Sequence, residues 1–165
     1  MIRKIAVTGT KGKSTVLRLL EQVFLDVNRN VYGTYGIDGY YYNKKKIREG
    51  TNCENYLVWD NRAMQADVHL SEATSFTLKS GFYNDYVLDL GIFTSFDETE
   101  HQELHKKPKN YLSAKKKLFD SLGAGKKMVV CRDIPNYHEV VAGHEKNIIS
   151  YGIHPESEYN IKINM

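Results

Sequence analysis

A short stretch close to the N-terminus constrains the fold of this chain most strongly. Val7–Thr15 read VTGTKGKST, in which two glycines flank a basic residue and Gly-Lys-Ser follows. The preceding residues, Arg3–Val7, predict a short buried strand. After Ser14, apolar residues recur with helical spacing and predict one buried helix face, made of Val16, Leu19, Leu20, Val23, Phe24 and Val27. A glycine-rich turn between a strand and a helix is the setting of a phosphate-binding loop.

The predicted loop consists of Gly9, Thr10, Lys11, Gly12, Lys13, Ser14 and Thr15. Its backbone N–H groups and the start of the helix would face the phosphates of a nucleotide, and glycines allow the close approach. Lys13 is expected to reach the outer phosphates and Ser14 to offer its hydroxyl to Mg²⁺. The general pattern G-x-x-x-x-G-K-[ST] has glycine where this chain has Val7, so the match is incomplete. The alternative interpretation is an ordinary glycine-rich turn with a lysine nearby.

Strands and helices alternate along the rest of the chain. Strands are expected in residues 67–75, 86–95, 126–131 and 147–153, and helices in 54–65, in 110–122 with Gly123 as the stop, and from Pro135. Residues 36–50 indicate a hairpin or a long loop. This alternation predicts a mostly parallel sheet covered on both faces. The expected fold class is therefore α/β, a three-layer P-loop NTPase-like domain with a mostly parallel sheet flanked by helices, and residues 1–165 form one domain.

Composition narrows the functional class. Hydrophobic residues make up 41% of the chain, enough for a packed core, and the formal net charge of +3 is too small to indicate nucleic acid by itself. Tyrosines and lysines interleave at Tyr40–Lys46, but no nucleic-acid-binding motif accompanies them. Cys53 and Cys131 lie far apart, and no apolar run reaches the ~18 residues of a membrane span. We expect a cytoplasmic enzyme domain with no membrane or nucleic-acid partner.

Three stretches further along the chain hold candidate metal ligands. SEATS places Glu72 at the end of a predicted strand, where a carboxylate suits a hard cation. GIFTSFDETEHQELH contains His101 and His105, and NYLSAKKKLF contains Lys115 directly after Ala114. Taken singly, these stretches are also typical of a solvated strand end, an exposed polar loop and a basic helix face.

Taken together, in this order and spacing, the motifs resemble those of the Mur ligase family, which includes the peptidoglycan amino-acid ligases and folylpolyglutamate synthetase. TGTKGKST is similar to the family's Thr-Gly-Thr-Asn-Gly-Lys-Thr loop, SEATS to Glu-x-Ser-Ser, and YLSAK to Tyr-x-x-Ala-Lys. VVCRDIPNY and ISYGI resemble two later strands of the family. The chain departs from the pattern at Lys11, Thr74 and Glu100, and it has one extra residue between Thr94 and His101.

The resemblance implies roles for the matched residues. Ser14 and Glu72 would hold a first Mg²⁺, and His101 would hold a second together with Lys115 carbamylated by carbon dioxide. Lys13, His101 and Lys115 are therefore the catalytic candidates. Carbamylation turns a cation into an anion, and it needs a neutral amine, which the edge of a buried helix face favours.

The implied function is that of an ADP-forming ligase that uses ATP and Mg²⁺. ATP would convert a carboxylate acceptor into an acyl phosphate, which an amino acid then attacks, most commonly in peptidoglycan precursor synthesis. Family members carry a C-terminal domain, and many an N-terminal substrate domain; residues 1–165 match only the central ATPase domain, so a missing domain or partner subunit is expected. Two alternatives stay open. One is another P-loop phosphotransferase such as a small-molecule kinase, and the other is a nucleotide-binding module or fragment without full ligase activity.

Overall fold

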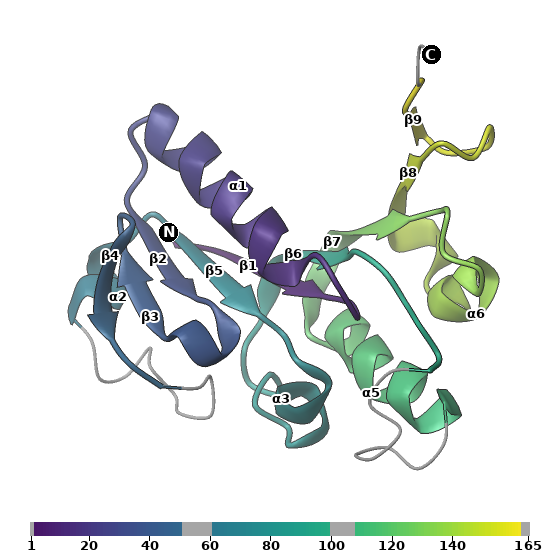
Figure 1. Cartoon of the computed structure of the whole chain (residues 1–165), viewed down its shortest axis with the longest axis horizontal. Helices are drawn as coiled ribbons and strands as arrows, with labels where there is room; N and C mark the ends of the chain where they lie inside the picture. Colours follow the sequence, from purple (N-terminus) through teal and green to yellow (C-terminus); the bar gives the residue numbers. More distant parts are fainter. Residues whose placement is uncertain (1, 51–60, 100–107, 163–165) are drawn as a thin grey trace.

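The computed structural model describes residues 2–50, 61–99 and 108–162. They form a nine-stranded sheet in the order β4-β3-β2-β5-β1-β6-β7-β8-β9 (Figure 1). Every neighbouring pair from β2 to β9 in that order is parallel, and β3 runs antiparallel to β2 and to β4. The bounds are β1 (Arg3–Thr8), β2 (Val31–Thr34), β3 (Tyr40–Tyr42), β4 (Lys45–Arg48), β5 (Val68–Glu72), β6 (Leu88–Phe93), β7 (Leu122–Cys131), β8 (Ile148–Gly152) and β9 (Tyr159–Asn160).

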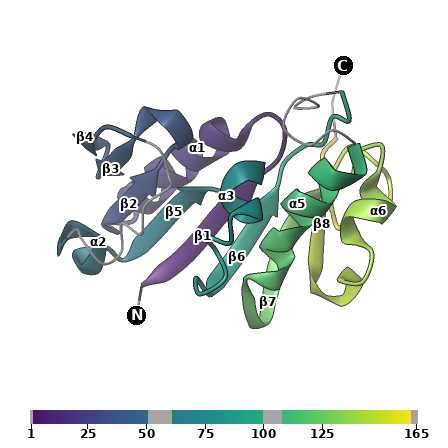
Figure 2. The ribbon, with the colours of Figure 1, turned by 90° about the horizontal axis from the view of Figure 1, so that it is seen from below.

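The helices lie on two sides of the sheet, which confirms the predicted α/β class. One face carries α1 (Lys13–Asp26), which packs on β1, β2 and β5. The opposite face carries α2 (Asn61–Gln65), α3 (Ser75–Lys79), α5 (Pro108–Asp120) and α6 (Tyr137–Val141), as the view in Figure 2 shows. Both faces therefore carry helices, as predicted, although none of the helices in the described residues lies over β6, β7 and β8 on the α1 side (Figures 1 and 2).

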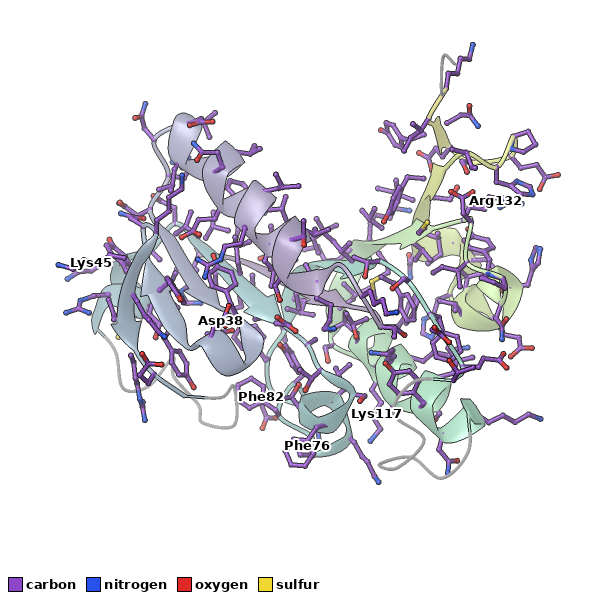
Figure 3. All side chains as sticks on the ribbon, in the orientation of Figure 1. Asp38, Lys45, Phe76, Phe82, Lys117 and Arg132 are labelled. Atoms are coloured by element: carbon purple, nitrogen blue, oxygen red, sulfur yellow. The ribbon has the colours of Figure 1, made fainter. Side chains whose placement is uncertain are left out.

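The core is divided by the sheet, because successive residues of a strand point to opposite faces. Ile5 and Val7 of β1 point to the α1 side and pack with Leu17, whereas Ala6 between them joins the larger cluster under α5. That larger cluster includes Phe93, Tyr111, Leu118 and Met128, all nearly or fully buried. Phe82, labelled in Figure 3, packs against both this cluster and a smaller one below β2 and β3.

Helix α1 buries only part of its predicted face: Val16, Leu20 and Phe24 are partly buried and pack against the cluster on the α1 side. Its buried residues are Leu17 and Glu21, whereas Leu19, Val23 and Val27 of the predicted buried face are 63%, 57% and 60% exposed. Polar contacts help to set which side of α1 faces the sheet. Ser14 bonds to Glu72, and the carboxylate of Glu21 accepts the backbone N–H of Lys44 at 2.8 Å. The apolar arc of α1 is therefore wider than the part that contacts the sheet.

Of the helix predicted for residues 54–65, the structure describes α2 over Asn61–Gln65, and residues 54–60 lie outside the described residues. The other element boundaries agree with the predictions within about four residues, with two corrections. Helix α5 ends at Asp120 rather than at Gly123, because Leu122 already pairs with Leu88 as the start of β7. The strand predicted for residues 67–75 ends at Glu72, since Thr74 caps α3 by accepting the N–H of Thr77 at 3.1 Å. The hairpin is confirmed as β3 and β4, and β9 is an additional strand.

Candidate nucleotide-binding site

The predicted phosphate-binding loop leaves the carboxyl end of β1 and leads directly into α1. Gly9 has φ +146° and Gly12 has φ +84°, backbone conformations that L-residues with side chains rarely adopt. A Cβ at Gly9 would lie 2.1 Å from Thr94 Oγ1, so only glycine fits there. Gly12 is the N-cap of α1, and the first-turn N–H groups that follow are the groups that bind phosphate at a helix N-terminus.

The strand next to β1 braces this loop. Thr94 Oγ1 donates to the carbonyl of Lys11 at 2.6 Å, and Ser95 Oγ accepts the Lys11 N–H at 2.8 Å. The N–H of Thr10 donates to the carbonyl of Ser95 at 2.9 Å. The loop therefore holds its shape through contacts with the end of β6. No function was predicted for Thr94 or Ser95 from the sequence, although polar residues that directly follow a strand parallel to β1 are a usable signal.

Ser14 and Glu72 face each other across the ends of β1 and β5. Ser14 Oγ donates to Glu72 Oε2 at 2.7 Å, and the Glu72 side chain is nearly buried. Lys13 Nζ lies 3.7 Å from Glu72 Oε1 and donates to the carbonyl of Thr10 at 3.0 Å. A hydroxyl beside a carboxylate is an oxygen donor set that suits Mg²⁺, so the residues present fit a hard divalent cation. Within the described ranges, no group of three or more His, Cys, Asp or Glu side chains is arranged for a metal ion.

Lys115 of α5 reaches the same loop from the other face of the sheet. Its side chain is only 2% exposed, and its Nζ donates to the carbonyl of Gly9 at 2.7 Å. The pKa of Lys115 is lowered to about 7, mainly by burial and also by the positive charge of Lys13, while the carboxylate of Glu72 acts in the opposite direction. A large fraction of Lys115 is therefore a neutral amine near neutral pH.

Tyr111, one turn before Lys115, completes the contact between α5 and the loop. Its hydroxyl donates to Thr10 Oγ1 at 3.3 Å, its ring lies 4.5 Å from Lys115 Nζ, and it stacks on Phe96. Thr10 Oγ1 also accepts the N–H of Asp97 at 3.0 Å. The sequence motif contained Tyr111 without indicating this role, because the contact depends on how α5 crosses the end of β1.

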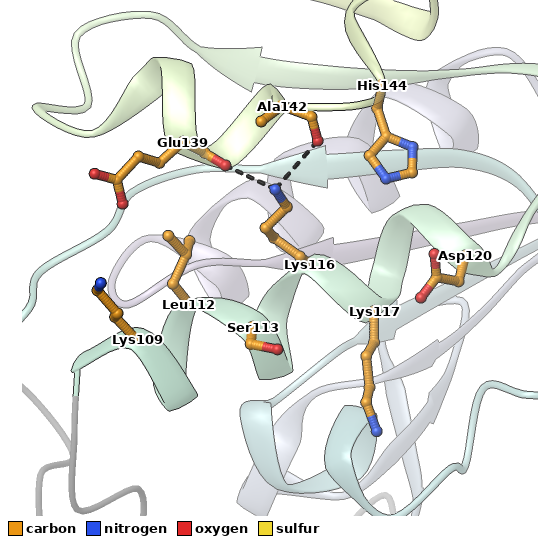
Figure 4. Close-up of a pocket in the computed structure, with 9 residues that line it drawn as sticks. All are labelled: Lys109, Leu112, Ser113, Lys116, Lys117, Asp120, Glu139, Ala142 and His144. Carbon is orange, nitrogen blue, oxygen red and sulfur yellow. Dashed lines mark hydrogen bonds between the residues drawn. The ribbon is translucent and has the colours of Figure 1, made fainter.

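The lysine next in sequence points elsewhere. Lys116 Nζ donates to the carbonyls of Glu139 and Ala142 at the end of α6, as the dashed lines in Figure 4 show. It lines a groove of about 660 Å³ on the outer side of α5, together with Lys117, Asp120 and His144. This groove is separate from the phosphate-binding loop.

The structure therefore brings together most of the predicted site. The loop residues Gly9–Thr15, Glu72 and Lys115 lie at one edge of the sheet. His101 and His105 lie outside the described residues, so the predicted ligand role of His101 remains a prediction. No helix in the described part of the chain is long and apolar enough to cross a membrane.

A family model described as "Mur ligase middle domain" matches residues 7–165. A UDP-N-acetylmuramoyl-L-alanyl-D-glutamate–2,6-diaminopimelate ligase of Chlamydia abortus is 28% identical over 160 residues, which are 94% of this chain and 33% of that protein. The chain thus spans about a third of the length of this curated relative.

Two solved structures share the fold. A structure of a UDP-N-acetylmuramoyl-L-alanyl-D-glutamate–2,6-diaminopimelate ligase matches with a TM-score of 0.78 and 24% identity, over 94% of this chain and 33% of that one. A bifunctional folylpolyglutamate synthase/dihydrofolate synthase with Mn, AMPPNP and L-glutamate bound matches with a TM-score of 0.61 and 17% identity, over 92% of this chain and 43% of that one.

Proposed function

Because its residues 7–165 match the Mur ligase middle domain, this chain belongs to that family, and we propose that it is the ATP-binding part of an ADP-forming carboxylate–amine ligase. The observation that carries the proposal is Lys115, which is buried 2.7 Å from the carbonyl of Gly9 and has a pKa lowered to about 7. A small-molecule kinase with the same loop has no need of a buried neutral lysine at this place. The proposal therefore rests on α5 as well as on the loop.

The loop and Lys13 bind the triphosphate. Lys13 Nζ contacts both Glu72 and the carbonyl of Thr10, so it lies at the loop and would turn toward the β- and γ-phosphates when ATP binds. The loop amides need little rearrangement, because Thr94 and Ser95 already hold the loop. ATP is the expected nucleotide, which is in line with the AMPPNP bound in the bifunctional synthase relative.

Ser14 and Glu72 are the residues that would hold a first Mg²⁺. Lys115 as a carbamate, with His101, would hold a second. In the carbamylation step the neutral Nζ attacks the carbon of carbon dioxide, an N–C bond forms, and one proton leaves the nitrogen. When bound, the cations neutralise negative charge on the phosphates and on the acceptor.

The proposed reaction has two steps. An acceptor carboxylate oxygen attacks the γ-phosphorus, the bond from that phosphorus to the β,γ-bridging oxygen breaks, and ADP leaves. The amino nitrogen then attacks the acyl carbon, the carbon–oxygen bond to phosphate breaks, and inorganic phosphate leaves while the nitrogen loses a proton. By the name of the Chlamydia abortus relative, the acceptor is a UDP-linked muramoyl peptide and the reaction belongs to peptidoglycan precursor synthesis.

Residues 1–165 would act as the central ATPase domain of such an enzyme, in the cytoplasm where ATP is supplied. The relatives contain about twice as much further polypeptide, to which substrate recognition is assigned here. The 165-residue chain is therefore expected to bind Mg-ATP but to form little amide. Robust amide synthesis by the purified chain would contradict this division of roles.

Calorimetric titration with ATP, with and without Mg²⁺, tests the proposal. We expect Mg²⁺-dependent binding that Lys13→Ala abolishes, because Lys13 is the cation aimed at the outer phosphates. Lys116→Ala is the matched control, since the Lys116 ammonium contacts only α6 carbonyls in the described structure. Unchanged binding in Lys13→Ala, or no dependence on Mg²⁺, would overturn the assignment of the loop.

A further inference from the structure

Thr8, the last residue of β1, carries a buried hydroxyl that has no hydrogen-bond partner among the described residues. The residue is 0% exposed, and its Oγ1 is hidden from solvent. Because side chains alternate along a strand, Thr8 points to the same face of the sheet as Ala6, which packs in the cluster under α5. Helix α5, which carries Lys115, lies on this face (Figure 2). The hydroxyl of Thr8 and the side chain of Lys115 therefore meet the loop from the same side.

The neighbours of Thr8 explain why its hydroxyl finds no acceptor. Phe93 is its register partner on β6, and Ala73 lies on the side of β5, where its N–H donates to the carbonyl of Val7 at 2.8 Å. The side chains of Phe93 and Ala73 both belong to the apolar cluster under α5. The carbonyl of Thr8 accepts the N–H of Thr94 at 3.0 Å. The backbone of Thr8 is therefore held in place, with apolar side chains on both sides.

An unpaired buried hydroxyl is unfavourable, and valine would have the same shape without this cost. Threonine at position 8 therefore favours an acceptor in one working state of the site. The other hydroxyls around the loop already have partners in the described structure. Thr10 Oγ1 accepts from Tyr111 and from the N–H of Asp97, Thr94 and Ser95 donate to the carbonyl of Lys11, and Ser14 donates to Glu72.

The carbamate proposed for Lys115 supplies such an acceptor. Carbamylation joins Nζ to the carbon of carbon dioxide and releases one proton, so the product keeps one N–H and gains two carboxylate oxygens. The remaining N–H can still donate to the carbonyl of Gly9, to which Nζ donates at 2.7 Å in the unmodified chain. Gly9 directly follows Thr8, so this bond keeps the new oxygens near Thr8. One oxygen can accept from the Thr8 hydroxyl while the other stays available to a cation.

The charges around Lys115 show why a neutral donor is useful there. The ammonium of Lys13 acts on Lys115 unfavourably while both are protonated, and a carbamate turns this repulsion into attraction. The carboxylate of Glu72 acts on Lys115 in the opposite sense, so it would repel the carbamate. A hydrogen bond from a hydroxyl stabilises an anion without adding charge to the site. Thr8 is suited to this role because its hydroxyl is not used elsewhere in the described structure.

We propose that Thr8 is a positioning residue whose hydroxyl donates to a carboxylate oxygen of carbamylated Lys115. This inference rests on the carbamylation in the proposed function, and it adds a residue that lies outside the predicted loop Gly9–Thr15. The hydrogen bond stabilises the carbamate against loss of carbon dioxide and fixes the direction of its second oxygen. Thr8 thus acts through Lys115.

Uptake of ¹³C-labelled bicarbonate by the 165-residue chain, followed by ¹³C NMR at one fixed pH, tests this role. The Lys115 carbamate is the signal that Lys115→Met lacks. Thr8→Val should raise the bicarbonate concentration at half saturation about tenfold, because it removes a hydrogen bond to a charged group. Thr8→Ser keeps the hydroxyl and should stay within about twofold of the wild type.

Thr34→Val is the matched control. Thr34 of β2 is also 0% exposed, and its Oγ1 likewise has no partner in the described part of the chain, so the substitution should leave uptake within about twofold. Thermal melts in buffer free of carbon dioxide separate positioning from a structural role. There Thr8→Val should melt at or above the wild-type temperature, because no hydrogen bond is lost. If Thr8→Val does not fold, as judged by circular dichroism, Thr8→Ala provides a second chain without the hydroxyl.

The outcomes distinguish this inference from the function on which it rests. Wild-type uptake in Thr8→Val, or equal loss of uptake in Thr8→Val and Thr8→Ser, would overturn the role of Thr8 and leave the ligase proposal intact. Absence of any wild-type signal that Lys115→Met removes would refute carbamylation, and the role of Thr8 with it. Calorimetric binding of Mg-ATP decides separately whether the loop binds nucleotide.

Discussion

Replacing Lys115 with methionine should change how the stability of the chain depends on pH. Methionine has a similar length and no charge, so the substitution removes the titrating group while filling most of the same space. In the folded chain the pKa of Lys115 is about 7, against an ordinary value of 10.5. Between these two values the unfolded chain binds about one more proton than the folded chain.

Proton linkage gives the sign and the size of the pH dependence of the free energy of unfolding. Because the unfolded state holds the additional proton, the free energy of unfolding of the wild type rises with pH from about 7 to about 10.5, by at most about 1.4 kcal/mol per pH unit. Integrated from pH 7.5 to 9.5, this amounts to about 2.5 kcal/mol. The Lys115→Met variant lacks this contribution, although the carbonyl of Gly9 loses its donor at every pH.

Urea denaturation followed by circular dichroism at several pH values measures the difference. In buffers free of carbon dioxide, the free energy of unfolding of the wild type should rise by about 2.5 kcal/mol relative to that of Lys115→Met from pH 7.5 to 9.5. Parallel stability profiles for the two proteins would refute the reasoning that burial keeps Lys115 neutral. A bicarbonate series then tests carbamylation, which should stabilise the wild type and leave Lys115→Met unchanged.

Three further predictions concern the nucleotide site. Gly9→Ala should lower the affinity for Mg-ATP about tenfold or more, because its Cβ would collide with Thr94. The same substitution should destabilise the fold by about 2 kcal/mol in thermal melts. An affinity equal to that of the wild type would contradict this geometry. Glu72→Gln should remove most of the Mg²⁺ dependence of ATP binding in calorimetry, since a carboxylate oxygen is lost beside Ser14, and an unchanged Mg²⁺ dependence would place the cation elsewhere. In a full-length ligase that contains this chain, Lys115→Ala should abolish ADP release in a coupled assay, and short carboxylic acids such as acetate should restore it. A fully active Lys115→Ala would favour the kinase alternative.

Much of the site could be predicted from the sequence because its constraints are local. The strand, two glycines, Gly-Lys-Ser and the helix follow one another without interruption, and the backbone angles of Gly9 and Gly12 depend on neighbouring residues. Glu72 was recognisable as a carboxylate near the end of a predicted strand, although that strand was predicted to continue to residue 75 and ends at Glu72. In each case the determining residues lie within a few positions, where steric limits act directly.

Contacts between residues far apart in the sequence could not be predicted from the sequence. The brace from Thr94 and Ser95 to Lys11 spans more than 80 positions, and it depends on β6 lying next to β1. Which part of the apolar face of α1 contacts the sheet depends on polar partners in β5 and in the turn between β3 and β4, which helical periodicity does not contain. Helical periodicity predicted which residues of α1 form its apolar arc, but not which of them the sheet covers.

The sequence by itself determined that a phosphate-binding loop joins β1 to α1, because glycine conformations and strand and helix patterns are properties of adjacent residues. It also singled out Lys115 by its motif position. Only the tertiary structure decided that Lys115 is buried against Gly9 with its pKa lowered to about 7, and that none of the described helices lies over β6, β7 and β8 on the α1 side. Burial and desolvation depend on which strands and helices become neighbours, and the order of strands in the sheet sets those neighbours.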